Sequence, residues 1–326
     1  MNIIQLSPAG KDYLWGGTRL RTEYHKHPEC NPLAETWECS VHPDGASMVI
    51  SGEFAGKSLA DVIAMHPEYL GGKYRNQKKF PILVKFIDAA QDLSVQVHPN
   101  DNYAQIHEQE NGKTEMWYIM DAVENASLIY GFQKNYSRQE IRTAIARHEI
   151  LDYLQKIPVH KGDVFFIPAG TVHAIGKGIL LAEIQENSNL TYRVYDYDRT
   201  DQNGQRRQLH IEKALDVMQL QPADSRNFVN SENSKNSENI AIRTLCECDY
   251  FKTDKIDLDD SRDFDFCVHP DSFQVLLCLD GNAILTHPQG CDTETIRIRK
   301  GDCLFLPANA GQCNLTGDAE FLKVIC

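Results

Sequence analysis

Short apolar runs separated by turn-forming residues dominate the pattern along this chain. The clearest runs cover residues 81–89 (PILVKFIDA), 93–99 (LSVQVHP), 115–122 (EMWYIMDA) and 163–169 (DVFFIPA). They are rich in β-branched and aromatic residues, which favour β-strands. Many short strands with turns between them are typical of a sandwich or jelly roll. The pattern therefore predicts a mainly β fold.

Three segments interrupt the strands with helical features. Residues 58–70 begin with a serine that can cap a helix. Residues 137–157 begin with Ser137, which is followed three residues later by Glu140 in the arrangement of a capping box. The apolar residues of this second segment follow roughly helical spacing, which predicts one helix over the whole range. Residues 210–220 form the third predicted helix.

One sequence phrase occurs twice. Residues 161–176 (KGDVFFIPAGTVHAIG) and 300–315 (KGDCLFLPANAGQCNL) share Lys-Gly-Asp and Pro-Ala in register. Upstream of each copy, residues 115–121 (EMWYIMD) resemble residues 274–280 (QVLLCLD). The two phrases lie further apart in the first copy, by about the length of the segment 137–157. The repeat therefore predicts two similar β domains, with a helix inserted into the first.

The predicted domains differ in their polar residues. In the aligned phrases, Gln274 replaces Glu115 and Gln312 replaces His173, so the second domain lacks two potential metal ligands. The first domain is expected to cover residues 1–223, and the second to cover residues 241–326. Between them, residues 224–240 form a polar stretch with little to bury, which is typical of a linker.

Composition excludes several classes of protein. The chain has 326 residues, which suits two domains, and its formal charge of -13 argues against a general nucleic-acid binder. It lacks both an apolar run long enough to span a membrane and an N-terminal secretory signal. The ten cysteines are scattered without a Cys-x-x-Cys pair, so we expect buried or free thiols in a cytoplasmic protein.

Four residues of the first domain form a candidate metal site. Gln96 and His98 are two apart, so on a strand they point to the same face. Glu115 opens a predicted strand, and His173 follows a Pro-Ala-Gly turn at the end of another. Because adjacent strands lie about 4.8 Å apart, these groups can meet inside one barrel and bind a divalent metal. The alternative is that each histidine is a hydrogen-bonded structural residue, which is how we interpret the other histidines.

Two cationic residues accompany these candidates. Arg193 lies in the phrase 186–200 (ENSNLTYRVYDYDRT), where alternation places it on one face with Tyr195 and Tyr197. It is either a solvated arginine or a fixed cation directed at an anion such as a phosphate or an enediolate. Lys113 lies two residues before Glu115 and is either a surface lysine or a cation beside the metal.

Taken together, these phrases resemble the type I mannose-6-phosphate isomerases, in their short bacterial form. The resemblance covers most of the first 200 residues and follows the family order. It rests on the stretches LWGG (14–17), AETWE (34–38), PILVKFID (81–88), SVQVHPND (94–101), GKTEMWYI (112–119), PAGTVHAIG (168–176) and TYRVYDYDR (191–199). In the C-terminal third it rests only on a degenerate β domain.

The resemblance implies a fold and a site. The fold would be mainly β, with two cupin-type jelly-roll domains and a few inserted helices. One Zn2+ per chain would be held in the N-terminal domain by Gln96, His98, Glu115 and His173. Arg193 would be the active-site arginine, and Lys113 would contact the substrate.

The resemblance also implies a reaction. The chain would interconvert D-mannose 6-phosphate and D-fructose 6-phosphate by proton transfer through an enediol, as a monomer or a small homo-oligomer. The family pattern has an acid four residues before the arginine, where this chain has Asn189. An amide cannot act as a base, so Glu35 or a metal-bound water would have to take that part.

Two other functions stay open at this point. The first is another metal-dependent cupin enzyme, such as an iron dioxygenase. Such enzymes use a His-x-His pair, whereas Gln96 occupies the first position here. The second is a non-catalytic cupin that binds a sugar phosphate. The complete ligand set and Arg193 argue against this second function.

Overall fold

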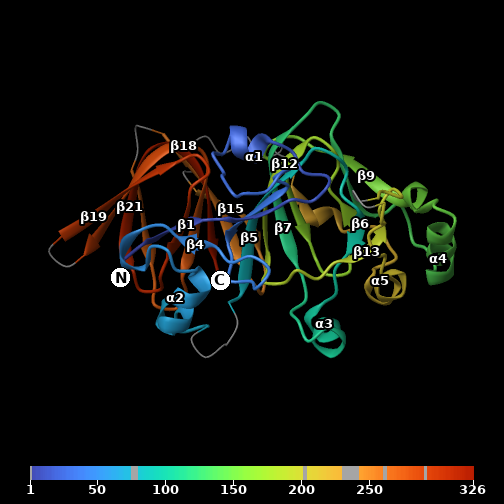
Figure 1. Ribbon diagram of the computed structural model, residues 1–326, viewed down its shortest axis with the longest axis horizontal. Coiled ribbons are helices and arrows are strands. Elements are labelled where there is room, and N and C mark those ends of the chain that lie inside the picture. The colour runs from blue at the N-terminus through green and yellow to red at the C-terminus, as the bar shows by residue number, and fades with distance from the viewer. Residues whose placement is uncertain (1, 75–79, 201–203, 230–241, 260–262, 290–291) are drawn as a thin grey trace.

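The computed structural model describes residues 2–74, 80–200, 204–229, 242–259, 263–289 and 292–326. Figure 1 shows two β units side by side along the long axis of the molecule, with most of the short helices at its periphery. The described strands form three sheets. The predicted mainly β fold is therefore confirmed.

A seven-stranded sheet is the larger sheet of the N-terminal unit. Its strand order is β14-β10-β7-β12-β5-β3-β2. The bounds are β2 (Ala9–Lys11), β3 (Glu35–Cys39), β5 (Ile82–Ala89), β7 (Glu115–Ala122), β10 (Val164–Ile167), β12 (Ile179–Glu186) and β14 (Phe228–Val229). Every residue of the central strands β5 and β12 is buried. The sequence predicted β5, whose residues are mostly apolar, but made no prediction for β12.

A five-stranded sheet packs against it. Its order is β13-β6-β11-β8-β9, and its bounds are β6 (Val95–Val97), β8 (Ser127–Phe132), β9 (Leu154–Pro158), β11 (His173–Ala174) and β13 (Tyr192–Tyr195). The core between the two sheets contains Tyr130 against Phe165, with ring centroids 5.7 Å apart. The described strands thus form a sandwich of two sheets, not the single closed barrel that we expected around the site.

The C-terminal unit is built around a third sheet. Its order is β15-β16-β21-β18-β20-β1-β4, with β17 paired to β21 and β19 paired to β18. The bounds are β1 (Ile4–Ser7), β4 (Met48–Val49), β15 (Ile242–Glu247), β16 (Lys252–Leu258), β17 (Phe264–Val268), β18 (Gln274–Gln289), β19 (Asp292–Arg299), β20 (Cys303–Leu306) and β21 (Gly311–Ile325).

The start of the chain belongs to this C-terminal sheet. Ile4 of β1 lies opposite Phe305 of β20, so the first strand crosses to the other unit (Figure 1). Aromatic stacking also joins the units. The ring centroid of Phe273 lies 5.0 Å from that of Phe80 and 5.1 Å from that of Phe305. The division at residues 224–240 stays a prediction, and the part from 230 onward lies outside the described residues.

The internal repeat is visible in the strand pairing. In the first copy, β7 pairs with β10, and Glu115 lies opposite Ile167. In the second copy, β18 pairs with β20, and Gln274 lies opposite Leu306. The aligned phrases thus occupy the same place in both units, as the sequence predicted.

The described α-helices are short. Their bounds are α1 (Arg19–Thr22), α2 (Leu59–Met65), α3 (Asp101–His107), α4 (Arg138–Ala146) and α5 (Ile211–Val217), and 3-10 turns cover Gly52–Phe54, Pro67–Leu70, Ile150–Tyr153 and Ser225–Asn227. The predicted capping box of Ser137 and Glu140 opens α4. The prediction of one helix over 137–157 was wrong beyond Ala146, because Leu154 and the residues after it pair with β8.

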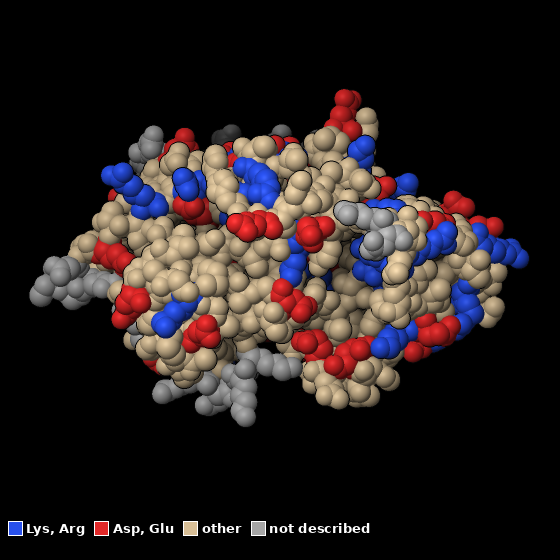
Figure 2. Space-filling view, viewed as in Figure 1, with Lys and Arg blue, Asp and Glu red and all other residues tan. Residues whose placement is uncertain are grey.

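Surface charge, cysteines and helix length add three observations. On the face shown in Figure 2, basic side chains are interspersed with acidic ones and do not form one continuous basic surface. The nine described cysteines form no disulfide. No helix in the described part of the chain is long and apolar enough to cross a membrane.

Candidate metal centre and the pocket beside it

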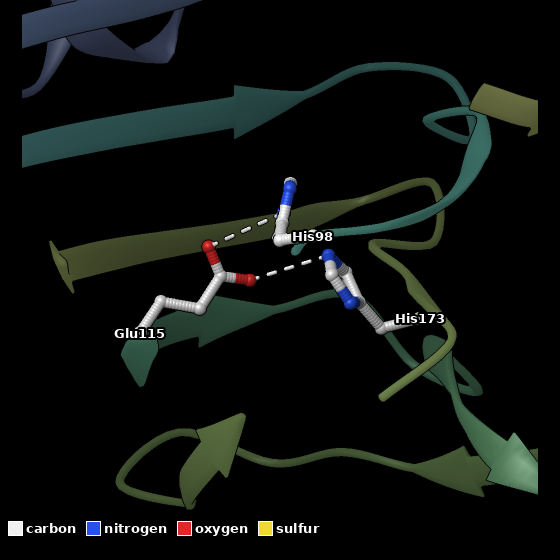
Figure 3. A group of neighbouring side chains, drawn as sticks. All are labelled: His98, Glu115 and His173. Atoms are coloured by element: carbon white, nitrogen blue, oxygen red, sulfur yellow. Dashed lines mark ion pairs between the residues drawn. The ribbon is translucent and has the colours of Figure 1, made fainter. Parts of the chain in front are cut away.

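Three buried side chains from three strand ends meet inside the N-terminal unit (Figure 3). His98 follows β6, Glu115 opens β7 and His173 opens β11. Nε2 of His98 lies 3.6 Å from Oε2 of Glu115, and Nε2 of His173 lies 3.2 Å from Oε1. The ligand atoms of these residues all lie within 4.8 Å of one another, which suits a single metal ion.

Gln96 adds a fourth polar side chain to this cluster. It lies in β6 directly opposite His173 of β11. The amide nitrogen Nε2 of Gln96 is 3.3 Å from Nε2 of His173. The structure therefore brings together all four residues that the sequence selected as candidate ligands.

Backbone carbonyls fix the protonation of both rings. Nδ1 of His98 lies 2.7 Å from the carbonyl oxygen of Leu190, and Nδ1 of His173 lies 2.9 Å from that of Thr171. Because a carbonyl only accepts hydrogen bonds, each Nδ1 carries the proton. Burial, followed by the ammonium group of Lys113, lowers the pKa of both rings, to about 3 for His173. Each neutral ring thus presents an unprotonated Nε2 to the cluster.

The carboxylate of Glu115 adds further hydrogen-bond acceptors to a cluster that has too few hydrogen-bond donors. Its Oε1 is buried and accepts no hydrogen bond from the described residues, although Nε2 of His173 is close. Burial raises the pKa of Glu115 to about 8, so the ionised form is unfavourable where it stands. A cation among these lone pairs would satisfy all of them, so the residues present fit a bound metal.

Lys113 is the ammonium group nearest to the cluster. Its Nζ donates to Oε2 of Glu115 and lies 3.1 Å from Nε2 of His98. The side chain is buried, with 4% of its surface exposed, so Lys113 is not the surface lysine that the sequence left open. It lies beside the candidate metal ligands.

Two further charged residues support this arrangement. Nζ of Lys85 lies 2.9 Å from Oε2 of Glu183 and 3.8 Å from Oε2 of Glu35. Nε1 of Trp117 donates to Oε1 of Glu183 at 3.0 Å. Burial alone would raise the pKa of Glu183, but the ammonium groups of Lys113 and Lys85 lower it, so Glu183 is ionised.

The sequence analysis missed both Lys85 and Glu183, although a signal was present. Lys85 stands in PILVKFIDA and Glu183 in ILLAEIQE, which are mostly apolar strands. Charged residues are seldom buried unless they are paired. A lysine in one buried strand and a glutamate in another therefore indicate an internal ion pair.

A pocket of about 230 Å³ lies next to the cluster. Gln96 and Lys113 reach its wall. Four cationic and two acidic side chains line it, namely Lys85, Lys113, Arg193, Arg207, Glu35 and Glu183. The lining residues thus carry two more positive than negative formal charges, in a chain whose formal charge is -13, and such a pocket suits a small anion.

Arg193 lies in the wall of this pocket on β13. Its Nε donates to Oγ of Ser94 and its Nη1 donates to the carbonyl oxygen of Gln208, both at 3.1 Å. No described carboxylate forms an ion pair with it. The strand ends at Tyr195, and Tyr197 has a positive φ of 54°, so the predicted alternation with Tyr197 fails. Its neutral partners leave the charge of Arg193 available to an anion.

Asn189, which stands where the family pattern has an acid, also reaches the pocket. Asn189 lines the wall, and its Nδ2 donates to Oδ2 of Asp44 at 2.8 Å. Glu35 lines the same pocket, and its Oε2 accepts a hydrogen bond from Nε1 of Trp37 at 2.8 Å. A carboxylate is therefore present in the pocket despite the amide at position 189.

Comparison with known proteins places the chain in a family. The model of the phosphomannose isomerase type I catalytic domain matches residues 3–128. A mannose-6-phosphate isomerase of Bacillus subtilis is 38% identical over 314 residues, which are 96% of this chain and 95% of that relative. The chain belongs to the type I phosphomannose isomerase family. A mannose-6-phosphate isomerase of Streptococcus mutans is 37% identical over 310 residues, covering 95% of this chain and 93% of the relative.

The type I phosphomannose isomerase fold extends through both units. The model of the mannose-6-phosphate isomerase cupin domain matches residues 241–326 in the C-terminal unit. The crystal structure of the mannose 6-phosphate isomerase from Bacillus subtilis is 33% identical and superposes with a TM-score of 0.88, covering 99% of each chain. The predicted family and the cupin-type fold are therefore confirmed.

Proposed function

We propose that this chain interconverts D-mannose 6-phosphate and D-fructose 6-phosphate, with one zinc ion per chain. The observation that carries the proposal is the cluster beside the positive pocket, where two neutral Nε2 atoms meet the carboxylate of Glu115, whose Oε1 accepts no hydrogen bond from the described residues. The names of the relatives support the choice of substrate, since those from Bacillus subtilis and Streptococcus mutans are mannose-6-phosphate isomerases.

Gln96, His98, Glu115 and His173 would hold the zinc. Neutral imidazole and carboxylate are ordinary zinc ligands, and the amide of Gln96 can present its oxygen. One carboxylate among four ligands leaves a net charge of about +1, and the ion would serve as a Lewis acid without redox chemistry. Zinc thus suits an isomerisation that has no net oxidation.

Cationic side chains of the pocket would stabilise the charge that develops during the reaction. A proton moves from C2 to C1 of the sugar through an enediol, so negative charge appears on the adjacent oxygens. Lys113 is buried beside the cluster and faces that charge, while Arg193 lies further along the wall and suits the phosphate or the enediolate. Fixed cations in a protected pocket stabilise such charge without reorganisation.

If Asn189 cannot carry the proton, the candidates are Glu35 and a metal-bound water. Glu35 lines the pocket, and Trp37 binds only its Oε2. We therefore assign the proton transfer to Glu35, a step that contributes roughly 10²–10⁴ in rate in other enzymes. Wild-type turnover in the variant Glu35→Gln would remove Glu35 from this role.

The first test is a coupled assay of mannose 6-phosphate turnover. It is run on the protein as purified, after chelation, and after zinc has been returned. We expect activity that disappears with the chelator and returns with zinc. Folded, zinc-loaded protein that binds the sugar phosphate without turnover would instead indicate a non-catalytic cupin. Oxygen uptake with an organic substrate would indicate another metal-dependent cupin enzyme.

Location and assembly belong to the same proposal. We expect the chain to act in the cytoplasm, as a monomer or a small homo-oligomer. Cell fractionation tests the first expectation, and size-exclusion chromatography with light scattering tests the second. A secreted chain, or a large assembly, would contradict them.

A further inference from the structure

The backbone just before Glu115 is fixed by the loop that follows His98. The N–H of Gly112 donates to Oδ1 of Asp101 at 2.8 Å, and the N–H of Lys113 donates to the carbonyl oxygen of Pro99 at 3.0 Å. Two segments that carry candidate metal ligands are therefore joined by two consecutive hydrogen bonds. Their relative position sets where Glu115 stands with respect to His98.

Thr114, the next residue of this segment, is held by a residue of β12. The N–H of Thr114 donates to Oε1 of Glu186 at 2.7 Å, and Glu186 is the buried last residue of β12. The three residues before Glu115 are thus anchored at every backbone N–H. An extended segment anchored in this way cannot shift without breaking buried hydrogen bonds.

The backbone at Gly112 packs so closely against the loop after His98 that no side chain would fit between them. A Cβ added to Gly112 would lie 2.4 Å from the backbone nitrogen of Asp101 and 2.5 Å from the carbonyl carbon of Asn100. Real Cβ contacts are never this short, so only glycine permits the two backbones to approach so closely. This independent observation confirms that the two segments pack as one unit.

A side chain of the C-terminal unit completes the arrangement. The hydroxyl of Tyr250 donates to Oδ2 of Asp101 at 3.0 Å, while Oδ1 of Asp101 holds Gly112. Tyr250 lies between β15 and β16 and packs against the apolar core that contains residues of both units. One carboxylate therefore links the C-terminal unit to the segment that carries Glu115.

We propose that Tyr250 and Asp101 are positioning residues through which the C-terminal unit holds Lys113 and Glu115 in place against His98. This inference rests on the proposed zinc-dependent isomerase. The Tyr250–Asp101 tether lines neither the pocket nor the candidate metal cluster, so it acts through the segment from Gly112 to Thr114 that precedes Glu115. Through this tether, the C-terminal unit helps to position the candidate metal site of the N-terminal unit.

The test compares variants of the full-length chain for zinc affinity, kcat and KM. Tyr250→Phe removes one hydroxyl and keeps the ring, and Asp101→Ala removes both hydrogen bonds. We expect Tyr250→Phe to weaken zinc binding about two- to tenfold, in line with one hydrogen bond, and to lower kcat with KM unchanged. Asp101→Ala should weaken zinc binding by at least about tenfold, as loss of a group that orients a metal ligand does.

A double-mutant cycle separates the tether from general destabilisation. Because Tyr250 acts through Asp101, adding Tyr250→Phe to Asp101→Ala should change zinc affinity no further. Asp101→Asn should remain close to the wild type, because an amide can accept from Gly112 and donate to the tyrosine oxygen. Independent effects in the cycle, or a Tyr250→Phe variant identical to the wild type, would contradict the proposal.

The control is Tyr103, which lies with Asp101 on α3. The hydroxyl of Tyr103 donates to Oδ2 of Asp216 at 3.1 Å, away from Asp101, so Tyr103→Phe removes a similar bond and should leave zinc affinity unchanged. Equal losses of zinc affinity in both variants would overturn the assignment.

A third readout keeps this inference separate from the proposed function. Amide hydrogen exchange of residues 111–117 in the zinc-free chain should be faster in Tyr250→Phe than in the wild type, and unchanged in Tyr103→Phe. That result would support the tether even if the wild type lacked isomerase activity. Unchanged exchange in Tyr250→Phe would contradict it even if the wild type were active.

Discussion

Two backbone carbonyls determine what the histidines of the cluster can do. Leu190 and Thr171 accept the Nδ1 protons of His98 and His173, which leaves each Nε2 as a lone-pair donor facing Glu115. A structural histidine can also donate to a carbonyl, but here the unprotonated nitrogens of two rings converge on one buried carboxylate. The ring orientation therefore favours metal binding over the alternative that these are ordinary hydrogen-bonded core residues.

His173→Ala should abolish zinc binding and turnover. The variant removes one of four ligands, and even groups that only orient a ligand contribute about 10- to 100-fold to affinity. We therefore expect zinc affinity to fall by more than about 100-fold, measured by competition with a chelator. His160→Ala is the control, because that side chain is 62% exposed and lies outside the cluster. Full zinc occupancy in His173→Ala would refute the site.

Arg193→Ala should keep zinc and lose turnover. Arg193 lies opposite Gln96 in the sheet, but its side chain donates to Ser94 and Gln208 and not to a candidate ligand, so its loss removes charge stabilisation and leaves the metal in place. Loss of one preorganised donor costs about 10²–10³ in kcat in other enzymes. Arg138→Ala is a control, because Arg138 pairs with Asp216 at the surface. Wild-type kinetics in Arg193→Ala would exclude Arg193 from the mechanism.

The residues of the site differ in how far sequence could reveal them. Gln96 and His98 were predictable, because a two-residue spacing on a strand gives a common face. Lys85 and Glu183 lie in different strands, and only the pairing of β5 with β12 places them opposite each other. Such partners depend on sheet order, which a single sequence does not specify.

At the scale of elements, the candidate ligands occupy the ends of strands. His98 follows β6, and Glu115 and His173 open β7 and β11, so rigid sheets carry each of them. The segment from Gly112 to Thr114 joins this frame through the hydrogen bonds of its backbone. A small shift there moves Glu115 directly.

Gly112→Ala tests this element. Its Cβ would meet backbone atoms at 2.4 Å, so the segment must move, at a cost of about 1–3 kcal/mol. We expect a lower melting temperature and weaker zinc binding, measured by calorimetry and chelator competition. Gly72→Ala is the matched control, because the nearest atom to its Cβ would be 3.9 Å away. Equal behaviour of the two variants would contradict the close contact.

The helical segment shows where local patterns fail. The capping box of Ser137 correctly marks the start of α4, because that signal is local. The end was wrong, since Leu154 continues into β9 and pairs with β8. Apolar spacing over 150–157 is compatible with helix or strand, and the tertiary pairing decides between them.

At the scale of the whole molecule, one of two similar units carries the site. Glu115 and Gln274 occupy the same register in their sheets, yet Gln274 donates to the carbonyl oxygen of Cys267 instead of facing a histidine pair. The C-terminal unit keeps the strands, packs against the first unit and holds Asp101 through Tyr250.

Gln312→His should not create a second zinc site. The variant restores only one of the two lost ligands, because Gln274 still stands in place of the acid. Zinc analysis of the purified variant should give the same content per chain as the wild type. Two zinc ions per chain would contradict our account of the repeat.

The central claim is that one zinc ion in this cluster makes the chain an isomerase. Its most direct test is to titrate zinc into the chelated protein and follow turnover of mannose 6-phosphate to fructose 6-phosphate. The account predicts no turnover without zinc, and a linear rise that ends at one equivalent per chain. Full turnover in the zinc-free chain, or none in a chain with one zinc bound, would contradict it.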